Sequence, residues 1–297
     1  MITFKEAART QDFAVSSEIF LRPETSPEMI REAAKLLTGH VDGVLVTDNQ
    51  FGQLHMSTLA LASLLLANGI DPIVQLACRN RNRIALLSDL LGAAALGVSS
   101  LMLIRGTKVP DGITPRPKAV LDIDAAELIA MASKLKSDDR LRTLPDFYLG
   151  GVVTPHPPKP GWTPKALLRK TEAGVQFVLT HICMDIPVIR TYMKHLVASG
   201  LLRRISLFAT LAIPGSAADA RWLCQNRPNV NIPDSIIERI EQAEDEEQES
   251  VRICAEQMQQ LAEIPGIAGA HLIPTRNLAT IPAAVEASGE RKNRSGS

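Results

Sequence analysis

Residues 73–106, IVQLACRNRNRIALLSDLLGAAALGVSSLMLIRG, contain the unit that decides the fold. The apolar run Ile73–Arg79 predicts a strand that is buried on both faces. Arg83–Leu96 has the length and pattern of a helix, Gly97 ends it, and Ser100–Gly106 predicts the next strand. A strand, a helix and a second strand in this order predict two parallel strands of one sheet.

The same alternation runs along nearly the whole chain. Six further strands are predicted, at Ala14–Phe20, Gly43–Asp48, Phe147–Val153, Phe177–Ile182, Ile205–Ile213 and Gly269–Thr275. Eight strands, each followed by a helix, predict an α/β fold of the (β/α)8 TIM-barrel type, with a parallel eight-stranded barrel. A doubly wound open sheet is the alternative.

Domain organisation follows from the same pattern. No linker divides the chain, so residues 1–289 are predicted to form a single (β/α)8 barrel domain. Thr107–Leu121 is predicted to be a long loop, and Ala217–Ile267 to hold extra helices before the last strand. The polar residues 290–297 predict a disordered C-terminal tail.

Composition excludes several classes of function. The 297 residues include 32 Lys and Arg against 32 Asp and Glu, so overall charge does not favour nucleic acid. The longest apolar stretch, Leu59–Ala67, is too short to cross a membrane. The first residues lack the apolar region of a signal peptide, and the four cysteines form no CxxC pair. We therefore expect a cytoplasmic protein that binds a small-molecule substrate, without a nucleic-acid or membrane partner.

Polar residues follow nearly every predicted strand. In a barrel these ends meet at one mouth, where barrel active sites lie. The residues are Glu18, Thr47, Asp48, Cys78, Arg79, Arg105, Gly106, Thr107, Thr154, His156, Thr180, His181, Thr210, Thr275 and Arg276.

Two of these residues, Glu18 and His181, interrupt otherwise apolar strands. A carboxyl group in an apolar mouth has a raised pKa, so Glu18 is predicted to stay protonated near neutral pH and to act as a general acid. The alternative is a structural Glu18 paired with Arg79 or Arg105. His181 is predicted either to transfer a proton or contact the substrate, or simply to bond a neighbour.

Arg79, Arg81 and Arg83 occupy alternate positions across a strand end and a helix start. Such a cluster suits an anionic group of a ligand, and ion pairs with Asp48 and Asp89 are the alternative. The sequence lacks the residue spacings of a metal site, a Rossmann dinucleotide site, a P-loop or a nucleophile elbow. No metal is predicted.

Several motifs resemble the methylenetetrahydrofolate reductase family, in particular its short single-domain bacterial and archaeal branch. They are Val46–Gln50, Gln75–Arg83, Ser88–Ala93, Lys170–Gly174, Ile232–Arg239 and Ile264–Leu272. The resemblance extends from Glu18 to Gly289 and implies a (β/α)8 barrel, in agreement with the strand count.

The resemblance also implies a function. It implies an oxidoreductase of folate one-carbon metabolism that transfers a hydride between NAD(P)H, FAD and 5,10-methylene- or 5-methyl-tetrahydrofolate. Glu18 matches the family's general acid. The implied cofactor-binding residues are Thr47, Arg105, Gly106, Thr107, His156, Arg169 and Lys170. The implied substrate-binding residues are Asp48, Gln75, Arg79, His181 and Arg276.

Four positions depart from the family pattern. Gln75 stands where the family has a histidine on the third strand, and Gly151–Val153 lack the family's aromatic residue at the start of the loop after the fifth strand. The family's aspartate after the fourth strand is Thr107, and its glutamine at the end of the sixth is His181. Leaving one polar group of a bound pterin unpaired costs ~1–3 kcal/mol. The changes leave open a flavin-free lyase or one-carbon transferase with Glu18 and His181 as its acid–base pair. A non-catalytic subunit, a homo-oligomer and a partner redox subunit also remain open.

Overall fold

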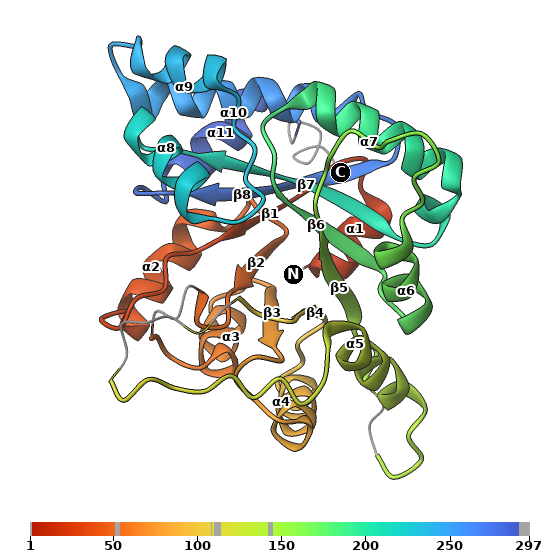
Figure 1. The fold of residues 1–297 in the computed structure, drawn as a ribbon. Coiled ribbons are helices and arrows are strands. Elements are labelled where there is room, and N and C mark those ends of the chain that lie inside the picture. Colours follow the sequence, from red (N-terminus) through yellow and green to blue (C-terminus); the bar gives the residue numbers. More distant parts are fainter. Residues whose placement is uncertain (1, 51–53, 108, 110–113, 142–144, 291–297) are drawn as a thin grey trace.

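The computed structural model describes residues 2–50, 54–107, 109, 114–141 and 145–290. Its strands form one closed parallel barrel in the order β1 to β8, and β8 pairs with β1 (Figure 1). The predicted (β/α)8 TIM barrel is confirmed, and the doubly wound sheet is wrong. The strands are β1 (Ala14–Glu18), β2 (Gly43–Val46), β3 (Pro72–Ala77), β4 (Ser100–Ile104), β5 (Tyr148–Val153), β6 (Phe177–Ile182), β7 (Ser206–Ile213) and β8 (Ile267–Pro274).

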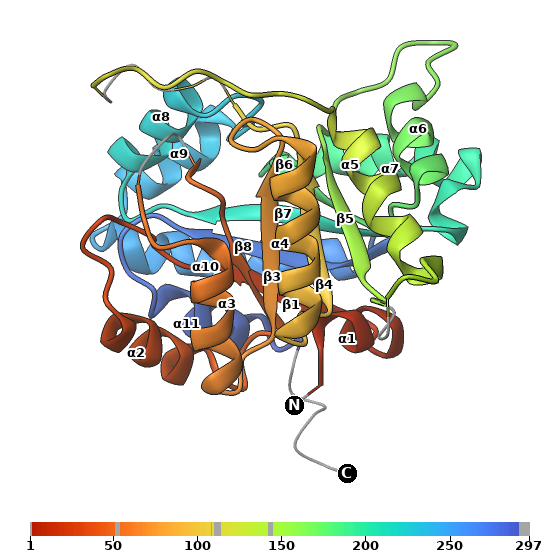
Figure 2. The ribbon, with the colours of Figure 1, turned by 90° about the horizontal axis from the view of Figure 1, so that it is seen from below.

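Helices surround the barrel (Figures 1 and 2). Most begin after a Ser, Asn or Asp whose side chain accepts a backbone N–H of the first turn. They are α1 (Phe4–Thr10), α2 (Pro27–Leu37), α3 (Thr58–Ala67), α4 (Arg83–Ala95), α5 (Ala125–Lys134), α6 (Lys165–Ala173), α7 (Ile186–Ser199), α8 (Ala217–Asn226), α9 (Asp234–Glu241), α10 (Glu246–Ala262) and α11 (Thr280–Ser288), with short 3-10 helices η2 (Leu135–Ser137) and η3 (Leu201–Arg203). The predicted extra helices before the last strand are α8, α9 and α10.

The predicted strand ends, the long loop and the C-terminal tail compare differently with the structure. The first four strands end two residues early, because residues such as Asp48 and Arg79 leave the strands to line a cavity. The described part of Thr107–Leu121 contains no helix or strand, as predicted. Residues 291–297 lie outside the described residues, so the predicted disorder of the tail is untested.

Helix α1 closes the end of the barrel where the strands begin (Figure 2). Its Phe4 is fully buried, with ring centroids 5.4 Å from Phe177 and 5.0 Å from Phe208 inside the barrel. The sequence signal for this unpredicted helix is a capping box, in which Thr3 and Glu6 bond each other's backbone N–H. Aromatic rings therefore fill one end of the barrel and leave the other end for a site.

The buried carboxyl group of Asp71 holds helix α1 against this end of the barrel. It accepts the backbone N–H of Phe4 at 2.8 Å and the hydroxyl of Ser99 at 3.2 Å. Burial raises the pKa of Asp71 to about 6, although these hydrogen bonds oppose the rise. A folded-state pKa above the ordinary value means that the folded protein binds a proton more tightly than the unfolded chain. The contribution of Asp71 to stability is therefore lost as pH rises through 6.

Asp71→Asn is expected to remove this pH dependence, because the amide keeps an acceptor for Phe4 and never ionises. Between pH 4 and pH 7.5 the unfolding free energy of the variant should gain ~3 kcal/mol relative to the unmodified protein. Urea unfolding at both pH values measures the difference. The exposed Asp139→Asn is the matched control. Its unfolding free energy should change between the two pH values by the same amount as that of the unmodified protein. The same change in unfolding free energy for Asp71→Asn as for the unmodified protein would contradict the raised pKa of Asp71.

No helix in the described ranges is both long and apolar enough to span a membrane.

Candidate active site

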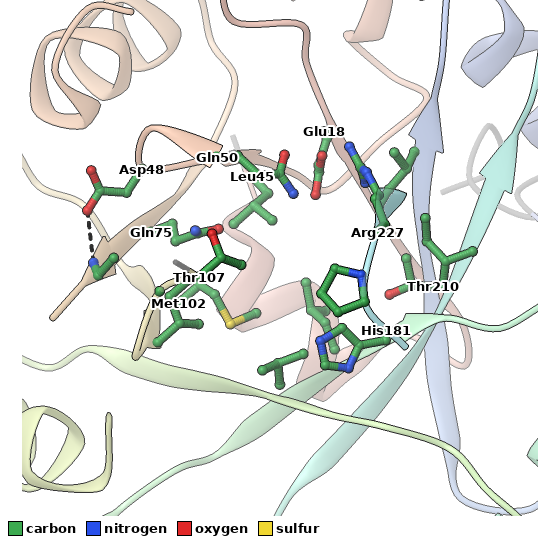
Figure 3. Close-up of a pocket in the computed structure, with 18 of the residues that line it drawn as sticks. Glu18, Leu45, Asp48, Gln50, Gln75, Met102, Thr107, His181, Thr210 and Arg227 are labelled. Carbon is green, nitrogen blue, oxygen red and sulfur yellow. Dashed lines mark hydrogen bonds between the residues drawn. The ribbon is translucent and has the colours of Figure 1, made fainter. Parts of the chain in front are cut away.

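A central cavity of about 290 Å³ lies at the carboxyl ends of the strands (Figure 3). Every strand contributes to it. Its apolar walls come mainly from Leu45, Ala77, Met102, Ile104, Val152, Leu179 and Ile273. Its polar lining includes Glu18, Asp48, Gln50, Gln75, Arg79, Arg105, Thr107, Thr180, His181, Thr210, Arg227 and His271. Apolar walls with a few convergent polar groups are typical of a small-molecule site.

Glu18 ends β1 and faces this cavity, with only 9% of its surface exposed. Its Oε1 lies 3.7 Å from Nε2 of His271 on β8. The other ring nitrogen of His271 is hydrogen-bonded to the Ser16 hydroxyl at 2.9 Å. Within the described chain Nε2 has no hydrogen-bond partner. The three side chains form a row from the barrel interior to the cavity.

The predicted protonation state of Glu18 is wrong. Burial raises the pKa of Glu18 as expected, but the contact with His271 and the charge of Arg227 lower it by more. The net pKa lies below the ordinary value, so Glu18 is ionised near neutral pH. The predicted alternative partners, Arg79 and Arg105, are also wrong, since His271 and Arg227 take that place.

Sequence reasoning assigned no role to His271 or Arg227. His271 interrupts the apolar strand Ile267–Pro274, which is the same signal that singled out His181. Arg227 follows α8 and has no such signal. It reaches the cavity because the loop after α8 folds over the mouth, and Figure 3 shows it beside Glu18.

Arg79 is the only member of the three-arginine cluster that lines the central cavity within the described residues. It is 4% exposed and donates to the Asn49 carbonyl at 2.9 Å and to the Thr107 hydroxyl at 3.1 Å. Burial lowers the pKa of Arg79, partly offset by Asp48. The hydroxyl oxygen of Thr107 therefore accepts a hydrogen bond from a buried guanidinium group. The hydroxyl hydrogen of Thr107 can be donated to a ligand.

The other two arginines form ion pairs, and those of Arg81 are the ones that the alternative named. Arg81 pairs with Asp48 and, at 2.8 Å, with Asp89. Arg83 pairs with Asp122 at 2.9 Å. The anion-binding cluster of three arginines is therefore wrong.

Asp48 and Gln75 both line the cavity, and their contacts with a substrate remain a prediction. Asp48 is already occupied, because it accepts the backbone N–H of Ala77 at 2.8 Å as well as Arg81 (Figure 3). Gln75 is buried on β3 and reaches the cavity with its amide.

His181 is the penultimate residue of β6 and enters the cavity from another wall than Glu18 (Figure 3). Its Nδ1 is hydrogen-bonded to the Thr154 hydroxyl at 2.8 Å. Burial lowers the pKa of His181, and the charge of Lys170 lowers it further. His181 is thus neutral at neutral pH and able to accept a proton.

A side cavity of about 280 Å³ adjoins the central one. The two share Glu18, Gln50, Arg227 and Ile273. The side cavity is also lined by Ile19, Phe20, Leu21, Arg22, Thr47, His55, Asp219, Trp222, Leu223, Pro274 and Thr275. Of the predicted cofactor-binding residues, Thr47 lies here.

Four predicted site residues line neither cavity. Arg169 pairs with Asp124 at 2.6 Å, and Lys170 donates to the Val152 carbonyl at 2.6 Å. His156 packs against Trp162 and Tyr192, with ring centroids at 5.1 and 5.4 Å. Arg276 is exposed and pairs with Asp219 at 2.6 Å. In the described ranges, no three His, Cys, Asp or Glu side chains gather as metal ligands would.

Fold and site together define a (β/α)8-barrel protein with a small-molecule cavity at the mouth of the barrel. The family model described as methylenetetrahydrofolate reductase matches residues 3–289. The chain belongs to this family, and the resemblance seen in the sequence is confirmed. A search of curated proteins finds no match.

Two solved structures share the fold at low sequence identity. One is an uncharacterized protein from Clostridium thermocellum described as binding two copies of 5-methyl-5,6,7,8-tetrahydrofolic acid. It has a TM-score of 0.64 and 13% identity, with 96% of each chain covered. The other is DmoA from Hyphomicrobium sulfonivorans, with a TM-score of 0.55 and 9% identity over 92% of this chain and 85% of that one.

Proposed function

We propose that the protein is an oxidoreductase of folate one-carbon metabolism, which interconverts 5,10-methylene- and 5-methyl-tetrahydrofolate at the expense of NAD(P)H. Family membership supports this function. The observation that carries it is the buried Glu18 carboxylate, which faces the central cavity with His271 behind it. The neighbour described as binding 5-methyl-5,6,7,8-tetrahydrofolic acid supports a reduced folate as the ligand.

FAD is the cofactor that the family implies, and the described residues fit it only in part. Arg105, Gly106 and Thr107 line the central cavity, where a flavin ring would lie. Arg169 and Lys170, expected to hold other parts of FAD, already bond Asp124 and the Val152 carbonyl. The residues therefore do not fit the whole cofactor, and the chemistry below includes no step on a flavin.

Glu18 has two tasks in the proposed reaction. A proton placed on N10 of the methylene-folate opens the five-membered ring and leaves an iminium cation at N5, which accepts a hydride derived from NAD(P)H. Because Glu18 is ionised in the free protein, its carboxylate must first take up a proton from solvent, which it then delivers to N10. The ionised carboxylate then stabilises the iminium cation in apolar surroundings. One proton and one hydride are consumed for each methyl group formed.

A second function is supported by His181. It is neutral, lines the same cavity and approaches from a different wall than Glu18. A neutral imidazole and a carboxyl on two walls of one cavity suit a flavin-free lyase or one-carbon transferase that acts on a folate or another small aromatic substrate. This function predicts turnover without consumption of NAD(P)H.

The purified protein is expected to oxidise NAD(P)H only when methylene-tetrahydrofolate is present, with one methyl-folate formed per NAD(P)H. Absorbance at the nicotinamide band measures the NAD(P)H consumed, and chromatography of the folates measures the methyl-folate formed. The visible spectrum before and after addition of FAD shows whether a flavin is retained. His181→Asn is expected to raise KM more than it lowers kcat, since His181 contacts the substrate.

The matched control for this variant is His195→Asn on the exposed face of α7. Folate turnover without NAD(P)H oxidation, together with loss of kcat in His181→Asn, would contradict the oxidoreductase and favour the second function.

A further inference from the structure

Arginines outnumber acids in the lining of the central cavity. The charged residues of its described lining are Glu18, Asp48, Arg79, Arg105 and Arg227. Asp48 is held in an ion pair with Arg81, and the charge of Arg227 acts on Glu18, whose pKa it lowers. Arg79 and Arg105 form no ion pair with a carboxylate of the described residues, and no step of the chemistry derived above uses them.

Arg79 is a buried cation whose hydrogen-bond partners are all neutral. It is 4% exposed, and its Nε donates to the side-chain oxygen of Asn80 at 2.8 Å. Its other acceptors are the Asn49 carbonyl and the carbonyl and hydroxyl oxygens of Thr107. A guanidinium group stays charged at every relevant pH, so burial without an anion is costly. An anionic group of a ligand at this wall of the cavity would offset that cost.

Arg105 adds a second positive charge to the same wall. The backbone N–H of Arg79 donates to the Arg105 carbonyl at 3.0 Å, so the two arginines occupy the ends of neighbouring strands. Arg105 is exposed at the rim of the cavity, and the Thr107 hydroxyl hydrogen lies on the same strand end. One wall of the cavity therefore combines two cations with a neutral hydrogen-bond donor.

The remaining walls restrict the molecule to which the anion can belong. They are mainly apolar, and the cavity measures about 290 Å³. Apolar walls and this volume suit a compact ring better than a hydrated inorganic ion. The planar guanidinium group matches the geometry of a carboxylate.

We propose that the wall formed by Arg79, Arg105 and Thr107 binds the carboxylate of a small aromatic acid, with the ring against the apolar lining. The inference goes beyond the proposed function and does not depend on whether the reaction consumes NAD(P)H. Under the oxidoreductase function such an acid competes with the folate for the cavity. Under the second function it belongs to the class of substrate.

Benzoate and benzamide test the role of charge, because they have nearly the same size and only benzoate is ionised at neutral pH. In an NMR titration that follows the ligand signals, benzoate is expected to bind the unmodified protein saturably. Benzamide should bind at least roughly tenfold more weakly, as for the loss of one charge-assisted hydrogen bond. Inorganic phosphate at the same concentration should not displace benzoate.

Thr107→Asp tests the site without removing a buried group. The Thr107 hydroxyl oxygen lies 3.1 Å from the guanidinium of Arg79, so the introduced carboxylate would pair with Arg79 in place of the ligand. Benzoate affinity should fall at least roughly tenfold, whereas the uncharged Thr107→Asn should change it by less than about threefold. Arg79→Met should also weaken binding, and Arg190→Met on the exposed face of α7 is its matched control. Far-UV circular dichroism checks that each variant is folded.

Equal affinity for benzoate and benzamide, displacement of benzoate by phosphate, or an unchanged benzoate affinity in Thr107→Asp would each overturn the proposal. Folate-dependent NAD(P)H oxidation by the same preparation decides the proposed function separately. Turnover without benzoate binding would leave the proposed function standing and overturn the carboxylate site. Benzoate binding without such turnover would support the carboxylate site and overturn the proposed function.

Discussion

Glu18→Gln is expected to lower kcat for folate-dependent NAD(P)H oxidation by about 10³-fold, within the range typical of a lost general acid. The amide has the shape of the carboxyl group but cannot deliver a proton to N10. It also has no charge to stabilise the iminium cation. Both losses fall on the transition state, so binding of 5-methyl-tetrahydrofolate should change little.

The position of Glu18 supports this size of effect. Glu18 faces the central cavity, whereas Asp48, the other carboxylate of the described lining, is held in an ion pair with Arg81. Glu32→Gln on the exposed face of α2 is the matched control, because it removes the same charge far from the cavity. Steady-state kinetics and a binding titration on both variants separate kcat from affinity. A Glu18→Gln protein that keeps more than about a tenth of kcat would contradict the assignment.

Gly269→Ala is expected to prevent folding of the barrel. Gly269 on β8 pairs with Ala14 on β1, where the sheet closes. A Cβ at Gly269 would lie 1.8 Å from the backbone oxygen of Ala14, so the two strands would have to separate. Opening a barrel seam exposes unpaired backbone groups on both strands and the apolar interior. We expect a loss of more than ~4 kcal/mol, comparable to the whole stability of many domains.

The matched control is Gly39→Ala after α2. Gly39 also has a positive φ of 84°, but nothing lies within 4 Å of the added Cβ. Only backbone strain remains, and the expected cost is ~1 kcal/mol. Soluble yield, far-UV circular dichroism and urea unfolding compare the two. A Gly269→Ala protein that unfolds at the same urea concentration as Gly39→Ala would show that the seam can adapt.

The order and approximate positions of the strands could be predicted from sequence because their signals are local, although the first four strands end two residues early. Apolar runs, glycine stops and capping residues define β3, α4 and β4 within 34 residues of chain, and the other units repeat the pattern. Helix α1 was missed because a short helix with a capping box carries little periodicity. Glu18 and His181 were found because each interrupts an apolar run.

Which of these groups act together could not be read from the sequence. Ser16 and His271 are 255 positions apart, yet the closure of β8 on β1 brings them within hydrogen-bond distance. Arg81 and Arg83 resemble an anion site in sequence, but Asp48 and Asp122 from other loops neutralise them.

The sequence by itself thus determined the (β/α)8 barrel, the family and the carboxyl group at the mouth. Only the tertiary structure decided the protonation state of that carboxyl, its partners His271 and Arg227, and the side cavity beside it. The physical reason is that hydrophobic pattern and capping act over a few residues. Burial, charge and cavity shape depend on groups that meet only when the barrel closes.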